Sequence, residues 1–271
     1  MKNITIFSGL GGIAVGAHRG ASAYAPENTM AAFERGLACG AELIELDVQL
    51  TKDGEVVVFH DLTVNKTTNG HGPLHDHTLA ELRALDAGSW FSNDYAGERV
   101  PTLEEVLVWA RDRIKLSIEL KQPLDRLEPA LAHRTARLVA EHGMNGQAQL
   151  MSFRHDLVKA VRDVNQEVLT AAISAHLIER PIALLEELGA QILNTPLQHL
   201  SEERVAELHD RGFYVYGSMS DDPAVFERLM AMGVDAMDTN VPDVMVGLRR
   251  NYRAALSRGF APAGLIAGST L

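Results

Sequence analysis

The sequence predicts a (β/α)8 TIM barrel, an α/β fold, with a small insertion after the hairpin of its second strand. Short apolar runs rich in β-branched residues alternate with longer helix-like stretches, and eight such units in about 250 residues match the size of this barrel. Several of the apolar runs end in polar clusters, as barrel strands do where they reach the catalytic mouth. A length of 271 residues fits one large domain better than two small ones.

Strands and helices are expected to alternate along the chain. The expected barrel strands lie near residues 13–18, 42–48, 115–121, 147–153, 167–172, 190–194, 213–218 and 234–238. The expected helices lie near residues 29–39, 102–113, 126–142, 155–164, 178–188, 201–211 and 222–231. Several helices are followed by a glycine, which can close a helix in the left-handed conformation: Gly40, Gly143, Gly189, Gly212 and Gly233. A doubly wound open sheet is the competing fold, and it is disfavoured because no Gly-rich phosphate loop follows the first strand.

The second strand is expected to form a hairpin instead of leading into a helix. Only the turn 51–54 separates it from the next apolar run, which ends at His60, and this is too short for a parallel crossover. If the turn is centred between Asp53 and Gly54, Asp47 lies directly opposite His60. The hairpin would therefore bring His60 to the rim of the barrel.

We expect residues 1–271 to form a single TIM-barrel domain with residues 61–101 as an insertion within it. The insertion shows little periodicity apart from a short helix expected near 78–85. Thr102 and Glu105 match a capping box, which marks the point where the barrel resumes.

The composition limits the partners of the protein. Its 25 basic and 36 acidic residues give a formal net charge of −11, which disfavours nucleic acid or an anionic membrane as a partner. Cys39 is the only cysteine, so an intrachain disulfide is excluded. The N-terminal apolar stretch resembles a weak secretion signal, but it runs directly into His18, so we expect it to belong to the mature fold. No apolar run reaches the roughly 18 residues of a membrane span. We therefore expect no membrane insertion and a cytoplasmic location.

The oligomeric state is left open by the sequence. The apolar tail 259–266 is expected to pack either on its own barrel or on a second copy of the chain, so a homo-oligomer is one of two outcomes.

Three carboxylates in two strands predict a metal site. Glu45 and Asp47 are two residues apart on a strand, so both side chains leave the same face, and Ser117, Glu119 and Lys121 share a face in the same way. In a barrel this face points inward at the C-terminal mouth. Carboxylates without thiolates suit one hard divalent cation, Mg²⁺, Ca²⁺ or Mn²⁺. Without a cation the carboxylates repel one another, so at least one pKa should be raised.

Histidines and cationic side chains complete the predicted site. His18 and His60 are the candidate general acid and base, because histidine changes charge near neutral pH. Arg19 could hold phosphate oxygens in a bidentate manner, although a salt bridge to a neighbouring carboxylate is the alternative. With Lys121 and the cation, this set suits cleavage of a phosphodiester. Eight of the other nine histidines are expected to be structural or to lie in a solvated loop, namely His71, His75, His77, His133, His142, His176, His199 and His209.

The same residues belong to a nearly continuous series of motifs between residues 17 and 121. They are His18-Arg19-Gly20, Pro26-Glu27-Asn28-Thr29, Glu45-Leu46-Asp47-Val48, Thr51-Lys52-Asp53-Gly54, His60-Asp61, Pro101-Thr102-Leu103-Glu104-Glu105 and Glu119-Leu120-Lys121. In these motifs the chain resembles the glycerophosphodiester phosphodiesterase family. The resemblance is weaker beyond residue 121, where Met151-Ser152-Phe153 and Gly233-Val234-Asp235 still correspond.

The resemblance implies a TIM-barrel hydrolase that cuts small glycerophosphodiesters to glycerol 3-phosphate and an alcohol. It implies that Glu45, Asp47 and Glu119 hold the divalent cation. It also implies that His18 and His60 are acid and base, in either order, with Arg19 and Lys121 on the phosphate. The route implied is attack by the adjacent hydroxyl of the substrate, giving a cyclic phosphodiester that water opens. This would place the enzyme in lipid and glycerol metabolism.

Two segments depart from the family pattern. The family's seventh strand commonly carries Trp-Thr-x-Asn beside the leaving-group or glycerol pocket, whereas residues 216–219 read Tyr-Gly-Ser-Met. Its last strand commonly ends in Thr-Asp-x-Pro, whereas residues 239–242 read Thr-Asn-Val-Pro. The first departure is expected to reshape the pocket, so a sugar or opine-like phosphodiester is an alternative substrate. A non-catalytic barrel that binds a phosphorylated ligand is a second alternative, disfavoured because no catalytic-type residue is missing.

Overall fold

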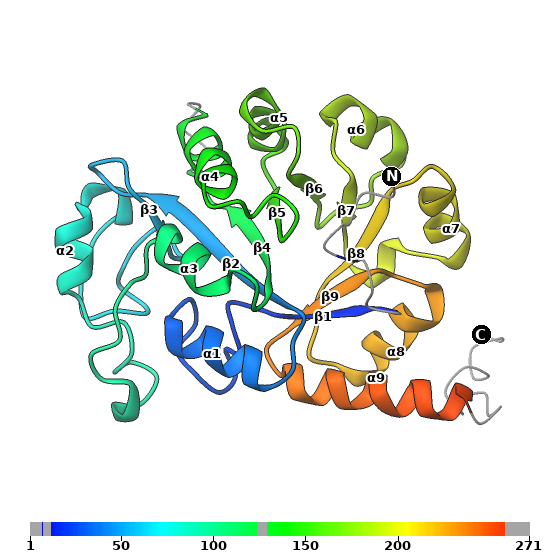
Figure 1. Ribbon diagram of the computed structural model, residues 1–271, viewed down its shortest axis with the longest axis horizontal. Coiled ribbons are helices and arrows are strands. Elements are labelled where there is room, and N and C mark those ends of the chain that lie inside the picture. The colour runs from blue at the N-terminus through cyan, green and yellow to red at the C-terminus, as the bar shows by residue number, and fades with distance from the viewer. Residues whose placement is uncertain (1–6, 8–11, 124–128, 258–271) are drawn as a thin grey trace.

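A closed barrel of eight parallel strands forms the centre of the computed structural model, which describes Phe7, residues 12–123 and residues 129–257 (Figure 1). In the described part of the chain the strands are β1 (Ala14–Ala17), β2 (Leu43–Leu50), β4 (Lys115–Leu120), β5 (Ala148–Ser152), β6 (Leu169–Ile173), β7 (Ile192–Asn194), β8 (Tyr214–Met219) and β9 (Ala236–Thr239). The ring closes at β1, where Gly16 pairs with Leu43 on one side and with Asp238 on the other. The predicted (β/α)8 fold is confirmed, and an open sheet is excluded by this closure.

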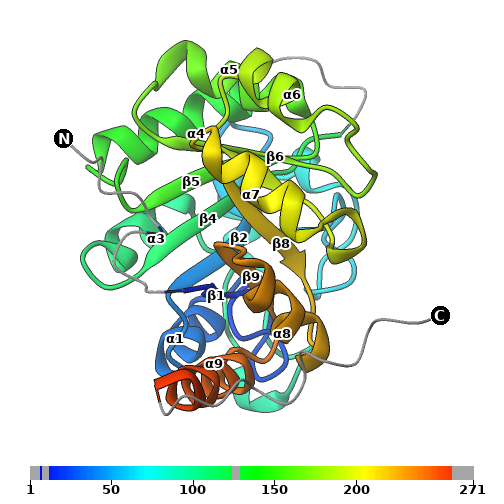
Figure 2. The ribbon, with the colours of Figure 1, turned by 90° about the vertical axis from the view of Figure 1, so that its right-hand side faces the viewer.

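Helices surround the barrel between its strands (Figures 1 and 2). They are α1 (Met30–Ala38), α3 (Leu103–Ala110), α4 (Ala130–Glu141), α5 (His155–Val164), α6 (Pro181–Leu188), α7 (Glu202–Asp210), α8 (Pro223–Met232) and α9 (Pro242–Ser257). The five glycines expected to follow helices all have positive φ angles. Helix α9 was not expected from the sequence. It packs on α8 and β1 and covers the barrel where the last strand meets the first.

Strand alternation separates two sets of side chains. Outward residues such as Ile44, Leu46 and Ile118 are buried in a core shared with α3 and α4. Inward residues near the start of the strands, including Leu43 and Ile192, form an apolar floor inside the barrel. The polar inward residues of β2 and β4 therefore lie above this floor, towards the C-terminal mouth.

The hairpin on β2 is present, but its expected register is wrong by one residue. Strand β3 (Val56–Val58) runs antiparallel to β2, with Val48 opposite Val58. The backbone of Thr51 also bonds that of Glu55, which leaves a three-residue loop with Gly54 in the left-handed conformation (φ 83°). This loop shifts the pairing relative to a two-residue turn.

His60 reaches the rim in a different way from the one expected. The backbone N–H of Phe59, not that of His60, donates to Asp47 O (2.8 Å). The chain then leaves the strand, and Gln49 Nε2 lies 2.8–3.1 Å from the carbonyl oxygens of Phe59, His60 and Asp61. The side chain of Gln49, which points inward, therefore holds the backbone that carries His60.

The insertion at residues 61–101 lies beside β3, at the left of Figure 1. It contains two 3₁₀ turns and α2 (Leu79–Ala84), close to the expected short helix. Leu74 and Leu82 of the insertion pack with Val57 of β3 in a small core of their own. Thr102 and Glu105 form the expected capping box at the start of α3.

Three further expectations fall wholly or partly outside the described residues. They concern the N-terminal stretch that resembles a secretion signal, the first residues of the helix expected near 126–142, and the apolar tail 259–266. Among the helices that the structure describes, none is both long enough and apolar enough to cross a membrane.

Gly16 is required by the packing inside the barrel. A Cβ atom at this position would lie 2.0 Å from Asp238 Oδ1 and 2.8 Å from the hydroxyl oxygen of Tyr216. Both neighbours are buried, so neither has room to move. Because Gly16 on β1 has no side chain, the inside of the barrel has room for Asp238 of β9 and Tyr216 of β8.

We expect Gly16→Ala to lower the free energy of unfolding by about 1–3 kcal/mol, as overpacking of a dense core does. Urea denaturation measures this. Gly247→Ala is the matched control, because a methyl group there meets nothing within 4 Å on helix α9 and should be neutral or slightly stabilising. Equal stability of the two variants would contradict the packing described above.

Candidate active site

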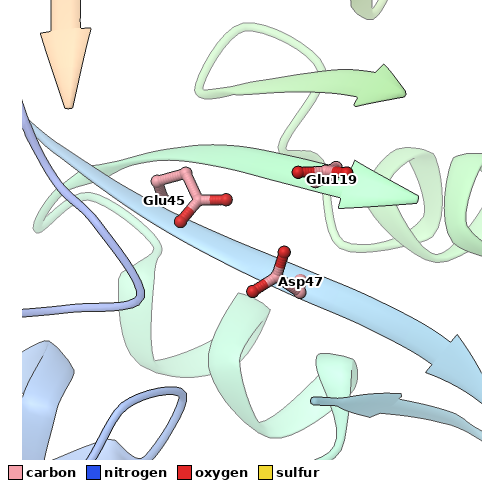
Figure 3. A group of neighbouring side chains, drawn as sticks. All are labelled: Glu45, Asp47 and Glu119. Atoms are coloured by element: carbon pink, nitrogen blue, oxygen red, sulfur yellow. The ribbon is translucent and has the colours of Figure 1, made fainter. Parts of the chain in front are cut away.

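Three carboxylates converge at the mouth of the barrel. Glu45 and Asp47 come from β2, and Glu119 comes from β4, where it pairs with Asp47 in the parallel register. Each offers an oxygen atom, and these atoms all lie within 4.8 Å of one another (Figure 3). All three side chains are buried. Oxygen ligands at this spacing fit one hard divalent cation.

Burial of three carboxylates side by side raises the pKa of two of them. Burial and the neighbouring carboxylates Asp47, Asp238 and Glu119 raise the pKa of Glu45 well above its usual value. Burial and Asp47 raise the pKa of Glu119 to about 7. This is the raised pKa expected for a carboxylate cluster without a cation. A divalent ion would remove the repulsion, which is why the residues fit a metal site.

Asp47 differs from its two neighbours. Its burial would raise its pKa, but Lys121, Arg19 and His60 outweigh burial, so the pKa of Asp47 lies below its usual value. Asn28 contributes as well, since its Nδ2 donates to Asp47 Oδ2 (2.9 Å). Asp47 is therefore the carboxylate that keeps its charge.

Asn28 has a structural role that the sequence reasoning did not assign. Besides its bond to the carboxylate, its Oδ1 accepts the backbone N–H of Asp47 (3.3 Å). Its backbone has φ 58°, a left-handed conformation that asparagine tolerates better than most residues. The sequence did offer one indication of this role, because Asn28 lies in the motif of residues 26–29, directly before α1.

Arg19 and Lys121 bring positive charge to the carboxylates. Lys121 Nζ lies 2.7 Å from Glu119 Oε1 and 3.5 Å from Asp47 Oδ1. Arg19 Nη1 pairs with Glu27 at 2.8 Å, as in the salt-bridge alternative, while its Nε lies 3.5 Å from Asp47 Oδ2. This Nε is buried and makes no hydrogen bond, but it is ion-paired with Asp47, so Arg19 offsets part of the negative charge of the carboxylates.

The backbone of Arg19 is unusual for its residue type. It has φ 55°, and its N–H donates to Glu45 Oε2 (2.9 Å). A left-handed conformation in a residue other than glycine costs roughly 1–3 kcal/mol and often marks a functional site. Here it turns the chain so that backbone and side chain both face the carboxylates.

The two histidines lie on the same rim and have different partners. His18 Nδ1 is 2.8 Å from Asn240 Oδ1, and His60 Nδ1 is 2.7 Å from Asp61 Oδ1. Both rings are within electrostatic reach of Asp47: its charge acts on the pKa of His18, and His60 acts on the pKa of Asp47. The structure thus brings together all seven residues that the sequence proposed for the site.

A buried pair beneath the carboxylates was missed by the sequence reasoning. The Tyr216 hydroxyl donates to Asp238 Oδ1 (2.6 Å), and both side chains lie inside the barrel. Burial, together with Asp47 and Glu119, raises the pKa of Asp238 to about 7. A carboxylate following the apolar residues of the last strand was the signal available in the sequence.

The segment 216–219 lies only partly where the resemblance placed it. Tyr216 is fully buried, so its side chain does not form a pocket wall for substrate. Ser218 donates to Asn194 Oδ1 (2.8 Å). Only Met219, which is 46% exposed, stands on the rim.

Several other histidines have partners that suit structural roles. His142 and His199 lie within hydrogen-bond distance of the backbone carbonyls of Leu138 and Ala175. His209 pairs with Asp235 at 2.9 Å.

The fold and the site define a class: a barrel enzyme with an acidic cluster, two histidines and two cationic side chains at its C-terminal mouth. The model of the glycerophosphoryl diester phosphodiesterase family matches residues 18–244, and the chain belongs to this family of enzymes.

Several relatives and solved structures align with this chain over nearly their whole length. A glycerophosphodiester phosphodiesterase of Caldanaerobacter subterraneus is 35% identical over 235 residues, covering 86% of this chain and 96% of the relative. Among solved structures, a phosphodiesterase of Oleispira antarctica in complex with the product sn-glycerol-3-phosphate has a TM-score of 0.82 at 28% identity, covering 88% of this chain and 97% of the other. A glycerophosphodiester phosphodiesterase of Agrobacterium tumefaciens has a TM-score of 0.76 at 30% identity, covering 87% and 99%.

The raised pKa of Glu119 predicts how the stability of the metal-free protein changes with pH. Between the usual value of 4.5 and about 7, the folded state binds a proton that the unfolded chain releases, so this residue makes unfolding easier as the pH rises. Glu119→Gln should therefore be more stable than the wild type at pH 8, by about 1–3 kcal/mol, and equally stable at pH 4. Urea denaturation at both pH values, in the presence of EDTA, measures the difference. An advantage that does not change with pH would contradict it.

Proposed function

We propose that this chain hydrolyses small glycerophosphodiesters to glycerol 3-phosphate and an alcohol, using one divalent cation and two histidines. The observation that carries the proposal is the meeting of Glu45, Asp47 and Glu119 within 4.8 Å, flanked by His18 and His60. The glycerol 3-phosphate complex of the Oleispira antarctica relative supports the product class. We further propose that residues 1–271 form one phosphodiesterase domain with residues 61–101 as its insertion.

The carboxylates and the two cationic side chains have separate proposed roles. Glu45, Asp47 and Glu119 would hold Mg²⁺, Ca²⁺ or Mn²⁺, which accept the same oxygen ligands. When bound, the cation would supply positive charge to the phosphoryl oxygens. Lys121 and the guanidinium group of Arg19 would bind and orient the same oxygens, and such preorganised charge lowers the barrier by several kcal/mol.

The histidines would move the protons. In the route that the family resemblance suggests, the adjacent hydroxyl of the substrate attacks phosphorus, and the alcohol leaves with a proton. Water then opens the cyclic phosphodiester. General acid–base catalysis of this kind contributes roughly 10²–10⁴-fold.

Removal of the cation should abolish turnover of glycerophosphocholine. EDTA should reduce the rate to background, and Mg²⁺, Ca²⁺ or Mn²⁺ should restore it. Glu45→Gln and Glu119→Gln should weaken the binding of Mn²⁺, which isothermal titration calorimetry measures independently of activity. Glu34→Gln, at an exposed carboxylate that pairs with Arg113, is the matched control. Full activity in EDTA would contradict the proposal.

A second candidate substrate, a sugar or opine-like phosphodiester, is favoured by one observation. Met219 stands on the rim with its sulfur 3.9 Å from Asn240 Nδ2, beside the partner of His18. This flexible apolar side chain occupies a segment where the family commonly carries Trp-Thr-x-Asn. The polyol part of the substrate would therefore meet a different wall.

A substrate panel separates the two candidates and the non-catalytic alternative. We expect kcat/KM for glycerophosphodiesters to exceed that for sugar phosphodiesters by at least tenfold. The reverse order would favour the second candidate. Tight binding of a phosphodiester without product after hours would favour a silent barrel.

A further inference from the structure

A cavity lined in part by Lys121 lies at the mouth of the barrel. It is enclosed by the ends of β2 and β4, the first turn of α4 and the 3₁₀ turn Leu74–Asp76 of the insertion. Its volume is about 330 Å³, and sites for small molecules usually occupy roughly 300–1,000 Å³. The cavity is therefore large enough to hold one part of a small substrate.

Two of the lining residues connect the cavity to the candidate active site. Lys121 Nζ lies 2.7 Å from Glu119 Oε1 and 3.5 Å from Asp47 Oδ1. Gln49 follows Asp47 by two residues on β2, so both side chains point inward, and its Nε2 donates to the backbone carbonyl of His60. A group bound in the cavity would thus lie beside the residues proposed to bind the phosphate and the cation.

The position of the cavity in the ring suits one particular end of the substrate. A phosphodiester has two ester groups, which leave phosphorus in different directions. In the proposed function one of them, the glycerol part, meets Met219 at the end of β8, beside the partner of His18. Strands β8 and β4 are separated by three strands in both directions around the ring, so they face each other across the mouth. With the phosphate held between them, the cavity at β4 is left for the alcohol.

The lining of the cavity offers both hydrogen-bonding groups and apolar surface. Gln49 Nε2 faces three backbone carbonyls, whereas no residue in the described part of the chain donates to its Oε1. This amide oxygen can therefore accept a hydroxyl group of a ligand. His75 and Gln122 add further polar atoms, and Leu50 and Leu131 add apolar surface. Such a lining matches a polyol, which carries hydroxyl groups on a hydrocarbon frame.

The charges around the cavity disfavour a cationic alcohol. Among the described residues that line it there is no carboxylate, and Lys121 contributes a positive charge. Asp76 Oδ1 lies 3.6 Å from His75 Nε2, but Asp76 is exposed and is not part of the lining. Glu119 and Asp47 are paired with Lys121 and belong to the proposed cation site. The described lining also lacks Phe, Tyr and Trp, whose ring faces attract quaternary ammonium groups.

We propose that this cavity binds the alcohol part of the substrate and selects an uncharged polyol, such as inositol, over a cationic alcohol, such as choline. The inference rests on the proposed function and narrows its substrate class. The overall reaction is unchanged, since water gives its hydroxyl group to phosphorus and its other hydrogen to the polyol that leaves. His75, for which the sequence predicted a structural or solvated position, becomes a residue that contacts the substrate.

Filling the cavity tests where the alcohol binds. Ala130 lines the cavity on the exposed first turn of α4. Ala130→Trp should lower kcat/KM for glycerophosphoinositol by about tenfold or more, and should change kcat/KM for the methyl ester of glycerol 3-phosphate by less than about twofold. The methyl group is too small to need the cavity. Ala140→Trp, at an exposed position near the other end of the same helix, is the matched control and should change neither value.

A comparison of alcohols tests the selectivity. For the wild type, kcat/KM for glycerophosphoinositol should exceed that for glycerophosphocholine by about tenfold or more. His75→Ala should lower kcat/KM for the inositol ester by about 2–10-fold, as loss of one hydrogen bond does, and leave that for the choline ester unchanged. Ala130→Leu, a milder change than Ala130→Trp, should give a smaller loss on the inositol ester with the same selectivity.

Failure of the inference is distinguishable from failure of the proposed function. Equal losses on the methyl and inositol esters in both Ala130 variants, or no loss on either ester, would overturn the role of the cavity. A wild-type preference for the choline ester would overturn the selectivity. In each of these cases the wild type still cleaves glycerophosphodiesters, as the proposed function requires. Absence of turnover of all three esters by the metal-loaded wild type would overturn the proposed function, and the inference with it.

Discussion

Mutual repulsion among buried carboxylates is the constraint on which the mouth of the barrel depends. Glu45, Asp47 and Glu119 lie within 4.8 Å of one another and are nearly excluded from water. Hydrophobic packing of the barrel supplies the free energy that holds them there, since their strands are anchored on the outside by a large apolar core. The raised pKa values of Glu45 and Glu119 show that the cluster favours protons, or a cation in their place.

Two residues with unusual backbone conformations donate hydrogen bonds to the carboxylates. Arg19 and Asn28 both adopt left-handed conformations, and the N–H of Asn28 donates to the carbonyl of Arg19 (2.9 Å). The two turns are therefore tied together, one bonding Glu45 and the other Asp47. Strain of this kind persists only where surrounding structure determines it, and here the barrel provides that structure.

Local rules predicted most of the fold and the principal residues of the site. Alternation along a strand placed Glu45, Asp47 and Glu119 on the inner face, because that rule needs only neighbouring residues. The prediction of the hairpin register was wrong because the backbone φ angle of Gly54 decides between a two-residue and a three-residue loop. Asn240 and Asp221 received no role in the sequence reasoning because their partnership with His18 spans most of the chain. The tautomer of a histidine depends on such distant partners, so it becomes readable only in three dimensions.

The most direct test of the central claim is a crystal structure with Mn²⁺ and glycerol 3-phosphate, with the ion located by its anomalous scattering. One anomalous peak is expected within coordination distance of Glu45, Asp47 and Glu119, with phosphate oxygens reaching Arg19 and Lys121. A peak elsewhere, or a phosphate bound away from the three carboxylates, would contradict it.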